Sequence, residues 1–65
     1  MSIAKQISYY RRLCELTRAD FANLLDVSVV TVTNYENGTA VPTAEKCVEM
    51  AHILGITTDQ LLGKN

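Results

Sequence analysis

The chain has 65 residues, of which 48% are hydrophobic, and its net charge is −1 at pH 7. This length allows one small domain, and the hydrophobic fraction argues against a disordered chain. Its apolar runs are far shorter than the ~20 residues of a membrane span, and MSIAKQISYY lacks the apolar region of a signal peptide, so we expect a cytoplasmic protein with no membrane contact.

The first predicted element is a helix from Ile3 to Cys14, with Ser2 as its N-cap. Four apolar residues recur at helical spacing and are expected to face the core: Ile3, Ile7, Tyr10 and Cys14. Glu15 and Leu16 then form a short link to the next element.

A second helix is predicted over Arg18–Leu25, with Thr17 as N-cap and Asp20 as a weak capping-box partner. Its apolar residues are expected on one face: Phe21, Ala22, Leu24 and Leu25. Asp26 interrupts this pattern. Because Asp tolerates the left-handed backbone region better than most residues, we expect a tight turn there.

Ser28 is the expected N-cap of a third helix over Val29–Asn37, and Gly38 stands where a left-handed C-cap belongs. Three valines and two threonines in this segment favour a strand by propensity, so tertiary packing must impose the helix. If Val32 and Tyr35 point inward, helical spacing turns five residues outward: Val29, Val30, Thr33, Asn34 and Asn37.

After a loop over Thr39–Pro42, a fourth helix is predicted from the Thr43 cap to Leu54, where Gly55 stops it. Its expected apolar side is formed by Cys47, Val48, Met50, Ala51 and Leu54. A fifth helix is predicted over Thr58–Leu62, with a capping box of Thr57 and Gln60. Ile56, Leu61 and Leu62 should be buried, and the last three residues, Gly63 to Asn65, should fray.

The segment from Thr17 to Gly38 resembles the helix-turn-helix of the phage lambda and 434 repressors and Cro proteins, the XRE family. Three positions carry the resemblance most directly: small Ala22, turn residue Asp26 and buried Val32. Further matches are the apolar core positions, the LT entry and the ENG exit, at Phe21, Leu25, Val27, Tyr35, Leu16-Thr17 and Glu36-Asn37-Gly38.

This resemblance covers nearly the whole chain and implies an all-α, five-helix lambda-repressor-like DNA-binding domain over residues 1–65. The sequence departs from the family pattern at four positions. Arg18 stands where the family often has Gln, and Asp26 where it often has Gly. Val29 and Val30 stand where many members carry polar base readers.

A helix in the major groove reads bases with side chains from one face, mainly near its N-terminal half. On the third helix, the Asn34 amide can bond adenine N6 and N7 together. Thr33 can donate, accept or offer its methyl, and Val29 and Val30 can contact thymine methyl groups. The alternative for Asn34 is a solvated residue on an exposed face. The valine pair can equally belong to the core or to a protein contact.

Phosphate contacts are expected at the N-terminus of the second helix, where Thr17 and Arg18 adjoin free backbone N–H groups. The resemblance implies further backbone contacts at Asn37 and Thr39, although both can simply form the turn. Three other cations either extend this footprint or only solvate the surface: Lys5, Arg12 and Lys46.

Arg11 and Glu36 stand where family members form an ion pair between the first helix and the end of the third. The resemblance therefore implies a bidentate pair that fixes the angle of the recognition helix. The alternative is two unrelated surface charges.

The net charge of −1 and the isoelectric point near 5.6 argue against nucleic-acid binding, which favours basic domains. The distribution weakens this objection. Residues 1–25 hold four cations against two carboxylates, a net +2, whereas residues 26–65 hold two cations against five, a net −3. One end of the domain can therefore face phosphate.

Sites for metals, cofactors and catalysis are not indicated. Cys14 and Cys47 fit two buried reduced thiols better than a disulfide, and with His52 as the single histidine a zinc site is not expected. No pattern assembles a nucleophile with a base, and no glycine-rich phosphate loop is present.

The sequence thus predicts a sequence-specific double-stranded DNA-binding transcriptional regulator of the phage-repressor type. We expect a homodimer on an operator with two half-sites, because a single small domain makes few contacts. No cofactor, small-molecule ligand or enzyme activity is expected. The alternative is a helix-turn-helix protein-interaction module, such as an antitoxin or a partner-binding domain, with weak or no DNA binding.

Overall fold

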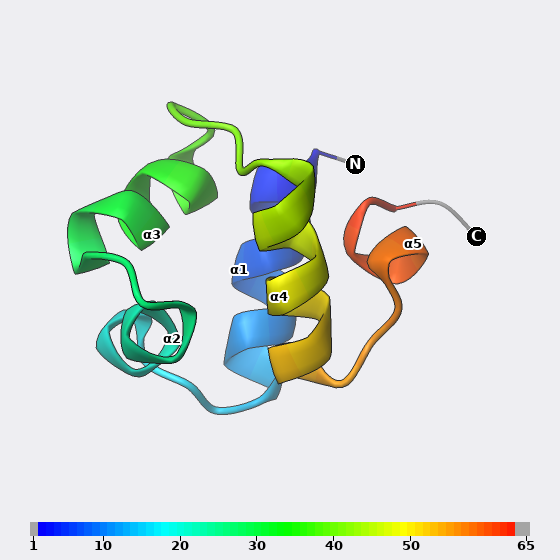
Figure 1. The fold of residues 1–65 in the computed structure, drawn as a ribbon, viewed down its shortest axis with the longest axis horizontal. Coiled ribbons are helices and arrows are strands. Elements are labelled where there is room, and N and C mark those ends of the chain that lie inside the picture. The colour runs from blue at the N-terminus through cyan, green and yellow to red at the C-terminus, as the bar shows by residue number, and fades with distance from the viewer. Residues whose placement is uncertain (1, 64–65) are drawn as a thin grey trace.

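Five helices and no strand make up residues 2–63, the part of the chain that this computed structural model describes. The helices are α1 (Ile3–Leu13), α2 (Arg18–Leu25), α3 (Val29–Asn37), α4 (Ala44–Leu54) and α5 (Thr58–Leu61) (Figure 1). The predicted all-α, five-helix architecture is confirmed. The fraying expected for Lys64 and Asn65 lies outside the described residues.

Each helix begins directly after a serine or threonine whose side-chain oxygen accepts a backbone N–H three residues later, as predicted. These N-caps are Ser2, Thr17, Ser28, Thr43 and Thr57. The Asp20 and Gln60 side chains complete capping boxes by accepting the N–H of Thr17 and Thr57. Because such a cap contributes about 1 kcal/mol, local sequence alone fixes where these helices start.

Left-handed residues end three of the helices. Asp26 ends α2 with φ 58° and ψ 45°, and its N–H bonds the carbonyls of Ala22 and Asn23. Gly38 and Gly55 end α3 and α4 with φ 80° and 71°. The tight turn predicted at Asp26 is therefore confirmed, and it sets α3 directly after α2.

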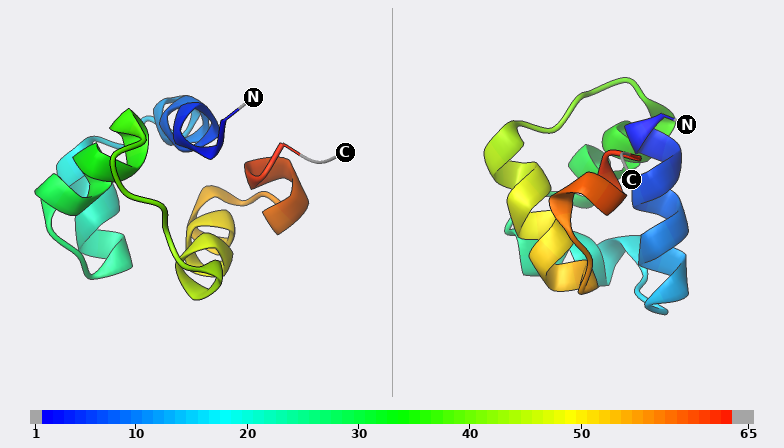
Figure 2. Two further views of the ribbon diagram at one scale, coloured as in Figure 1. Left: turned by 90° about the horizontal axis from the view of Figure 1, so that it is seen from above. Right: turned by 90° about the vertical axis from the view of Figure 1, so that its right-hand side faces the viewer.

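The helices surround one hydrophobic core. In Figure 1, α2 and α3 lie at one end of the molecule and α5 at the other, with α1 and α4 between them. α3 packs against both α1 and α2, whereas α4 contacts α2 and α5; Figure 2 shows this arrangement from two further sides. The largest side chains that are fully buried are Phe21, Ile7, Leu25, Met50, Leu61 and Val32.

The valine-rich segment after Ser28 is helical, as tertiary packing was expected to require. Val32 is fully buried and Tyr35 nearly so, both within the core cluster. Val29 and Val30 are exposed, at 45% and 68% of their surface. The predicted inward and outward faces of α3 are thus the observed ones.

The prediction that Cys14 faces the core is wrong. α1 ends at Leu13, and Cys14 is an exposed C-cap residue whose Sγ lies 3.6 Å from the Leu54 carbonyl oxygen. Glu15 then adopts φ 58°. Since the chain leaves the helix at this point, helical periodicity no longer places the Cys14 side chain. Cys47 is buried as predicted.

Two apolar residues assigned to the core are exposed instead. Leu24 is 56% exposed and Val48 is 57% exposed. Each lies about 100° around its helix from the centre of the buried stripe, because one residue turns an α-helix by that amount. α5 also ends one residue earlier than predicted, at Leu61, with Leu62 as its C-cap.

A buried amide joins the two ends of the chain, a contact that the sequence did not indicate. Gln6 of α1 is buried, and its Nε2 donates to the carbonyl oxygen of Gln60 in α5 at 3.1 Å. This bond satisfies a polar group in the interior and ties α5 to α1. None of the helices within residues 2–63 combines the length and apolar character needed to cross a membrane.

Substitution Gly55→Ala should destabilise the domain by about 1–2 kcal/mol, the penalty for a side chain in the left-handed region. A Cβ at Gly55 would meet no heavy atom within 4 Å, so backbone strain is the whole effect. Thermal unfolding followed by circular dichroism should show a melting temperature lower by roughly 4–8 °C per kcal/mol. The control, Asp26→Gly, removes a Cβ at a similar φ and should not lower the melting temperature; equal melting of Gly55→Ala and wild type would contradict the argument.

Candidate nucleic-acid interface

The outer face of α3 carries the side chains that the sequence assigned to base reading. Val29 and Val30 are exposed near its start, and Thr33 and Asn34 are half-buried one turn later. All four therefore remain at least partly accessible on α3, whereas Val32 and Tyr35 are buried.

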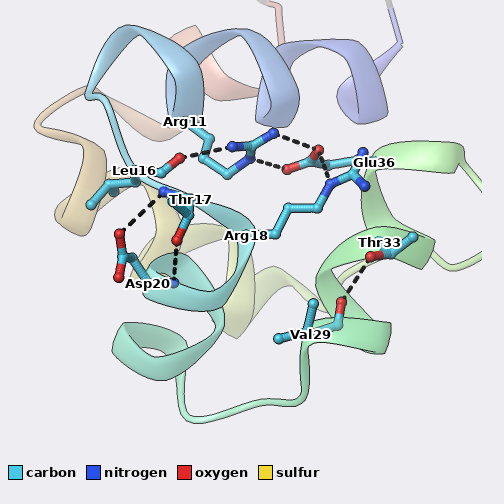
Figure 3. A network of polar contacts seen from close by, with 8 residues as sticks. All are labelled: Arg11, Leu16, Thr17, Arg18, Asp20, Val29, Thr33 and Glu36. Carbon is cyan, nitrogen blue, oxygen red and sulfur yellow. Dashed lines mark hydrogen bonds and ion pairs between the residues drawn. The ribbon is translucent and has the colours of Figure 1, made fainter.

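Thr33 has fewer hydrogen-bonding options than its residue type suggests. Its hydroxyl donates to the Val29 carbonyl oxygen at 3.0 Å, one helical turn back (Figure 3). The hydroxyl hydrogen is thereby committed within α3, so only the oxygen lone pairs and the methyl group remain for a ligand. In this conformation Thr33 can accept a hydrogen bond from a base amino group or contact a thymine methyl.

The side-chain amide of Asn34 is uncommitted. Within residues 2–63 it makes no hydrogen bond to protein, so both its donors and its acceptor remain available. Its backbone carbonyl, by contrast, accepts the N–H groups of Gly38, Thr39 and Ala40 and closes the turn after α3. The residue is therefore held by its backbone, while its side-chain amide has no protein partner within residues 2–63.

The N-terminus of α2, where phosphate contacts were predicted, contacts α3 through Arg18 and Glu36. Thr17 Oγ1 accepts the Asp20 N–H at 3.0 Å, which leaves its own hydroxyl hydrogen available. Arg18 is the first residue of the helix and its side chain is 41% exposed. Hydroxyl, guanidinium and helix dipole there all favour a negatively charged ligand.

Asn37 and Thr39 lie at the other end of α3 and differ in availability. Asn37 is exposed, and its amide has no hydrogen-bond partner within the described residues. Thr39 donates both its N–H and its hydroxyl hydrogen to the Asn34 carbonyl oxygen, at 3.0 and 3.3 Å. Thr39 therefore forms the turn, and contact with a phosphate would require its hydroxyl to leave that carbonyl.

Arg11 and Glu36 form the bidentate pair that the resemblance implied. Arg11 Nε donates to Glu36 Oε2 at 2.6 Å, and the second terminal nitrogen of Arg11 donates to Oε1 at 3.1 Å. The first terminal nitrogen donates to the Leu16 carbonyl oxygen at 2.7 Å. Arg11 thus joins α1, the α1–α2 link and the end of α3.

A third member of this cluster was not foreseen. Arg18 Nε donates to Glu36 Oε1 at 3.1 Å, so one carboxylate binds two guanidinium groups (Figure 3). The Glu36 side chain is only 2% exposed. The resemblance implied a partner for Glu36 only in Arg11, so this second contact with Arg18 was missed.

Glu36 stays ionised despite its surroundings. Burial by itself raises the pKa of a carboxyl, but hydrogen bonds and charges from Arg11 and Arg18 outweigh it and hold the pKa of Glu36 below its ordinary value of 4.5. The cluster therefore carries one negative and two positive charges at neutral pH.

Lys46 is engaged elsewhere and does not belong to this surface. Its Nζ donates to the Leu25 carbonyl oxygen at 3.0 Å, at the C-terminal end of α2, and lies 3.3 Å from Glu49 Oε2. A cation at a helix C-terminus complements the dipole there. Of the three extra cations considered for phosphate contact, Lys46 thus has a structural role, whereas Lys5 and Arg12 are exposed on α1.

Comparison with known families gives a match that covers most of the chain. A family model described as Helix-turn-helix matches residues 7–61, which includes all of α2 and α3. The chain is also similar to the cryptic phage CTXphi transcriptional repressor RstR of Vibrio cholerae serotype O1, with 31% identity over 64 residues. That alignment covers 98% of this chain but 57% of the length of the relative.

Two solved structures share the fold. The P22 c2 repressor protein, crystallised in complex with synthetic operator 9T, superposes with a TM-score of 0.90 at 20% identity, over 100% of this chain and 98% of that one. A transcriptional regulator from Listeria innocua superposes with a TM-score of 0.89 at 28% identity, over 98% of this chain and 60% of that one.

Substitution Glu36→Gln should cost about 3 kcal/mol of stability at pH 7, since it leaves buried guanidinium charge uncompensated. The folded-state pKa of Glu36 is depressed, so its stabilisation is complete above pH 4.5 and is lost as the pH falls through the folded-state pKa. Urea unfolding from pH 7 to pH 3 should therefore show a difference in the free energy of unfolding between wild type and variant. This difference should shrink as the pH falls below 4.5.

The matched control for this experiment is Glu15→Gln. Glu15 is exposed, and its carboxylate has no hydrogen-bond partner within residues 2–63. This variant should follow the wild type closely at every pH. A stability gap for Glu36→Gln that stays constant from pH 7 to pH 3 would show that ionisation of Glu36 does not stabilise the fold.

Proposed function

Because the chain belongs to the helix-turn-helix family, we propose that it is a sequence-specific double-stranded DNA-binding repressor. One observation carries this proposal. The outer face of α3 presents the free amide of Asn34, and Glu36 near the end of the same helix contacts Arg18 at the cationic N-terminus of α2. A base reader on α3 and a phosphate ligand at the start of α2 are the two kinds of group that a helix in the major groove needs.

The relatives support the same function. RstR is named a transcriptional repressor, and the P22 c2 repressor was crystallised with an operator. Since this chain spans 57% of the length of RstR, we extend to it only DNA binding and repression. The matched part of this chain, residues 7–61, contains the helix-turn-helix, a motif that places its second helix in the major groove of DNA.

In the proposed complex α3 lies in the major groove and reads bases in two ways. Asn34 bonds adenine through N6 and N7, and Thr33 accepts from a base amino group or meets a thymine methyl. Val29 and Val30 contact thymine methyl groups near the start of the helix. An operator half-site should accordingly be rich in A·T pairs.

Phosphate contacts hold α3 in register without reading sequence. Thr17 and Arg18 bind the DNA backbone at the N-terminus of α2, and Asn37 binds it as the last residue of α3. Thr39 contributes mainly by closing the turn that presents Asn37. The start of α2 and the end of α3 meet through the Arg18–Glu36 contact, so these residues would bind the backbone beside one another.

We further propose a homodimer on DNA that uses an apolar groove of about 370 Å³ between the α3–α4 loop, α4 and α5. Val41 at its rim is 79% exposed, and Ile3, Pro42, Val48 and Leu62 line it. A second copy would cover these residues and place the second α3 about one helical turn of DNA away.

One observation supports the alternative function, a helix-turn-helix domain that binds a protein partner. Val29 and Val30 form an exposed apolar pair on a chain with net charge −1, which also suits a protein partner. This alternative predicts no DNA affinity at low salt and loss of the partner in Val29→Asp.

Selection of binding sites from random DNA should return a defined half-site, and Asn34→Ala should relax preference at one base pair by about 1–3 kcal/mol. The affinity of wild type should also fall steeply with salt. Asn23→Ala, an exposed amide on α2, is the matched control and should keep the wild-type preference. Absence of binding at low salt would contradict DNA recognition and favour the protein-interaction alternative.

Substitution Val41→Gln should weaken dimerisation about tenfold. In the proposed dimer the second copy covers Val41, and a polar side chain there would lose this apolar contact. Sedimentation equilibrium on a duplex with two half-sites measures this directly. Binding to a single half-site should be unchanged. Leu24→Gln, an equally neutral change at an exposed apolar residue outside the groove, should have no effect; equal losses for both variants would exclude the groove as the dimer surface.

A further inference from the structure

The ion cluster at the end of α3 connects a buried carboxylate to an exposed cation. We propose that Glu36 is a positioning residue for DNA binding: it holds Arg18 through Nε, so that the terminal nitrogens of Arg18 are set in place for one DNA phosphate. This inference rests on the proposed function, since it names how one of its phosphate contacts is prepared.

The first support is that Arg11 and Arg18 bind the Glu36 carboxylate through different sets of nitrogens. Arg11 takes Oε2 through Nε at 2.6 Å and Oε1 through a terminal nitrogen at 3.1 Å. Arg18 reaches Oε1 only through Nε, also at 3.1 Å. Both terminal nitrogens of Arg18 therefore have no hydrogen-bond partner within the described residues.

The second support is the difference in burial between the two arginines. The side chains of Arg11 and Glu36 are 9% and 2% exposed, whereas that of Arg18 is 41% exposed. Arg11 also uses its remaining terminal nitrogen on the Leu16 carbonyl oxygen at 2.7 Å. Arg11 is thus the internal counter-ion, and Arg18 is the member that a ligand can reach.

The third support is the charge balance. Two guanidinium groups against one carboxylate leave a net charge of +1, and the excess lies on the exposed Arg18. A planar guanidinium offers a fork of donors that matches phosphate oxygens. Because Nε is already bound, the fork loses less conformational freedom when a phosphate arrives. Figure 3 shows Arg18 extending from the start of α2 to Glu36 on α3.

Lysine cannot replace Arg18 in this role. Its single nitrogen can either pair with Glu36 or reach a phosphate at full strength, whereas arginine does both with separate nitrogens. At an ordinary exposed phosphate contact, replacing arginine by lysine would cause little loss of DNA affinity. The geometry therefore distinguishes arginine from lysine at position 18, although the two residues carry the same charge.

The test measures affinity for the duplex recovered by selection, by fluorescence anisotropy across a range of salt concentrations. Removing a carboxylate near DNA should by charge alone tighten binding. If Glu36 positions Arg18, Glu36→Gln instead weakens binding about tenfold. Glu15→Gln removes the same charge from an exposed residue and should leave affinity equal or slightly higher.

A double-mutant cycle separates positioning from a change in the tilt of α3. Arg18→Gln should weaken binding and reduce the salt slope by about 0.9, the value for one phosphate contact. In that background Glu36→Gln should cause a clearly smaller fold loss than in wild type, because the part of its action that passes through Arg18 is already lost. The same fold loss in both backgrounds, or tighter binding by Glu36→Gln alone, would overturn the proposal.

Arg18→Lys decides the question if Glu36→Gln does not fold. It leaves the Arg11–Glu36 pair intact and keeps the charge, yet it should weaken binding about tenfold. Wild-type affinity for Arg18→Lys would overturn the positioning role. Wild-type binding to the selected duplex is the independent check on DNA recognition, so failure of the proposed function is seen in wild type and failure of this inference only in the variants.

Discussion

The burial of Val32 and Tyr35 makes the valine-rich segment a helix and determines how that helix is turned. Helix α3 contains five β-branched residues, and at about 0.6 kcal/mol each they oppose the helix by about 3 kcal/mol. Full burial of one large apolar side chain offers about 1.5–3 kcal/mol, so these two residues together offset the opposition. Packing against α1 and α2 therefore decides that α3 is a helix and also which face remains outside.

The ion cluster adds orientation to a helix that packing has already formed. Desolvation offsets much of the attraction in a buried pair, so Arg11 and Glu36 are weak evidence for a large gain in stability. Their geometry matters more. Arg11 contacts Glu36 and the Leu16 carbonyl together, which fixes the end of α3 relative to the entry into α2. The two helices that would meet DNA are thus held as one unit.

The sequence was sufficient wherever a local interaction decides the structure. Ser28 and Gly38 bound α3 as predicted, because caps depend on residues within one turn. The sequence was insufficient to predict which residues at the edge of the core are buried. Whether Leu24 or Val48 is buried depends on which direction the neighbouring helices occupy, and Cys14 lost its helical phase because α1 ended before it. These properties arise from tertiary packing.

The candidate site shows the same division. Helical spacing was enough to place Asn34 on the outer face, but not to show that Thr33 bonds back to Val29 or that Arg18 shares the carboxylate of Glu36. Both contacts depend on side-chain rotamers, which the residue type and its helical position do not determine. They also bear on how a chain of net charge −1 can approach DNA. One buried carboxylate is neutralised by Arg11, and Arg18 beside it keeps its positive end exposed, so local arrangement matters more than the total charge.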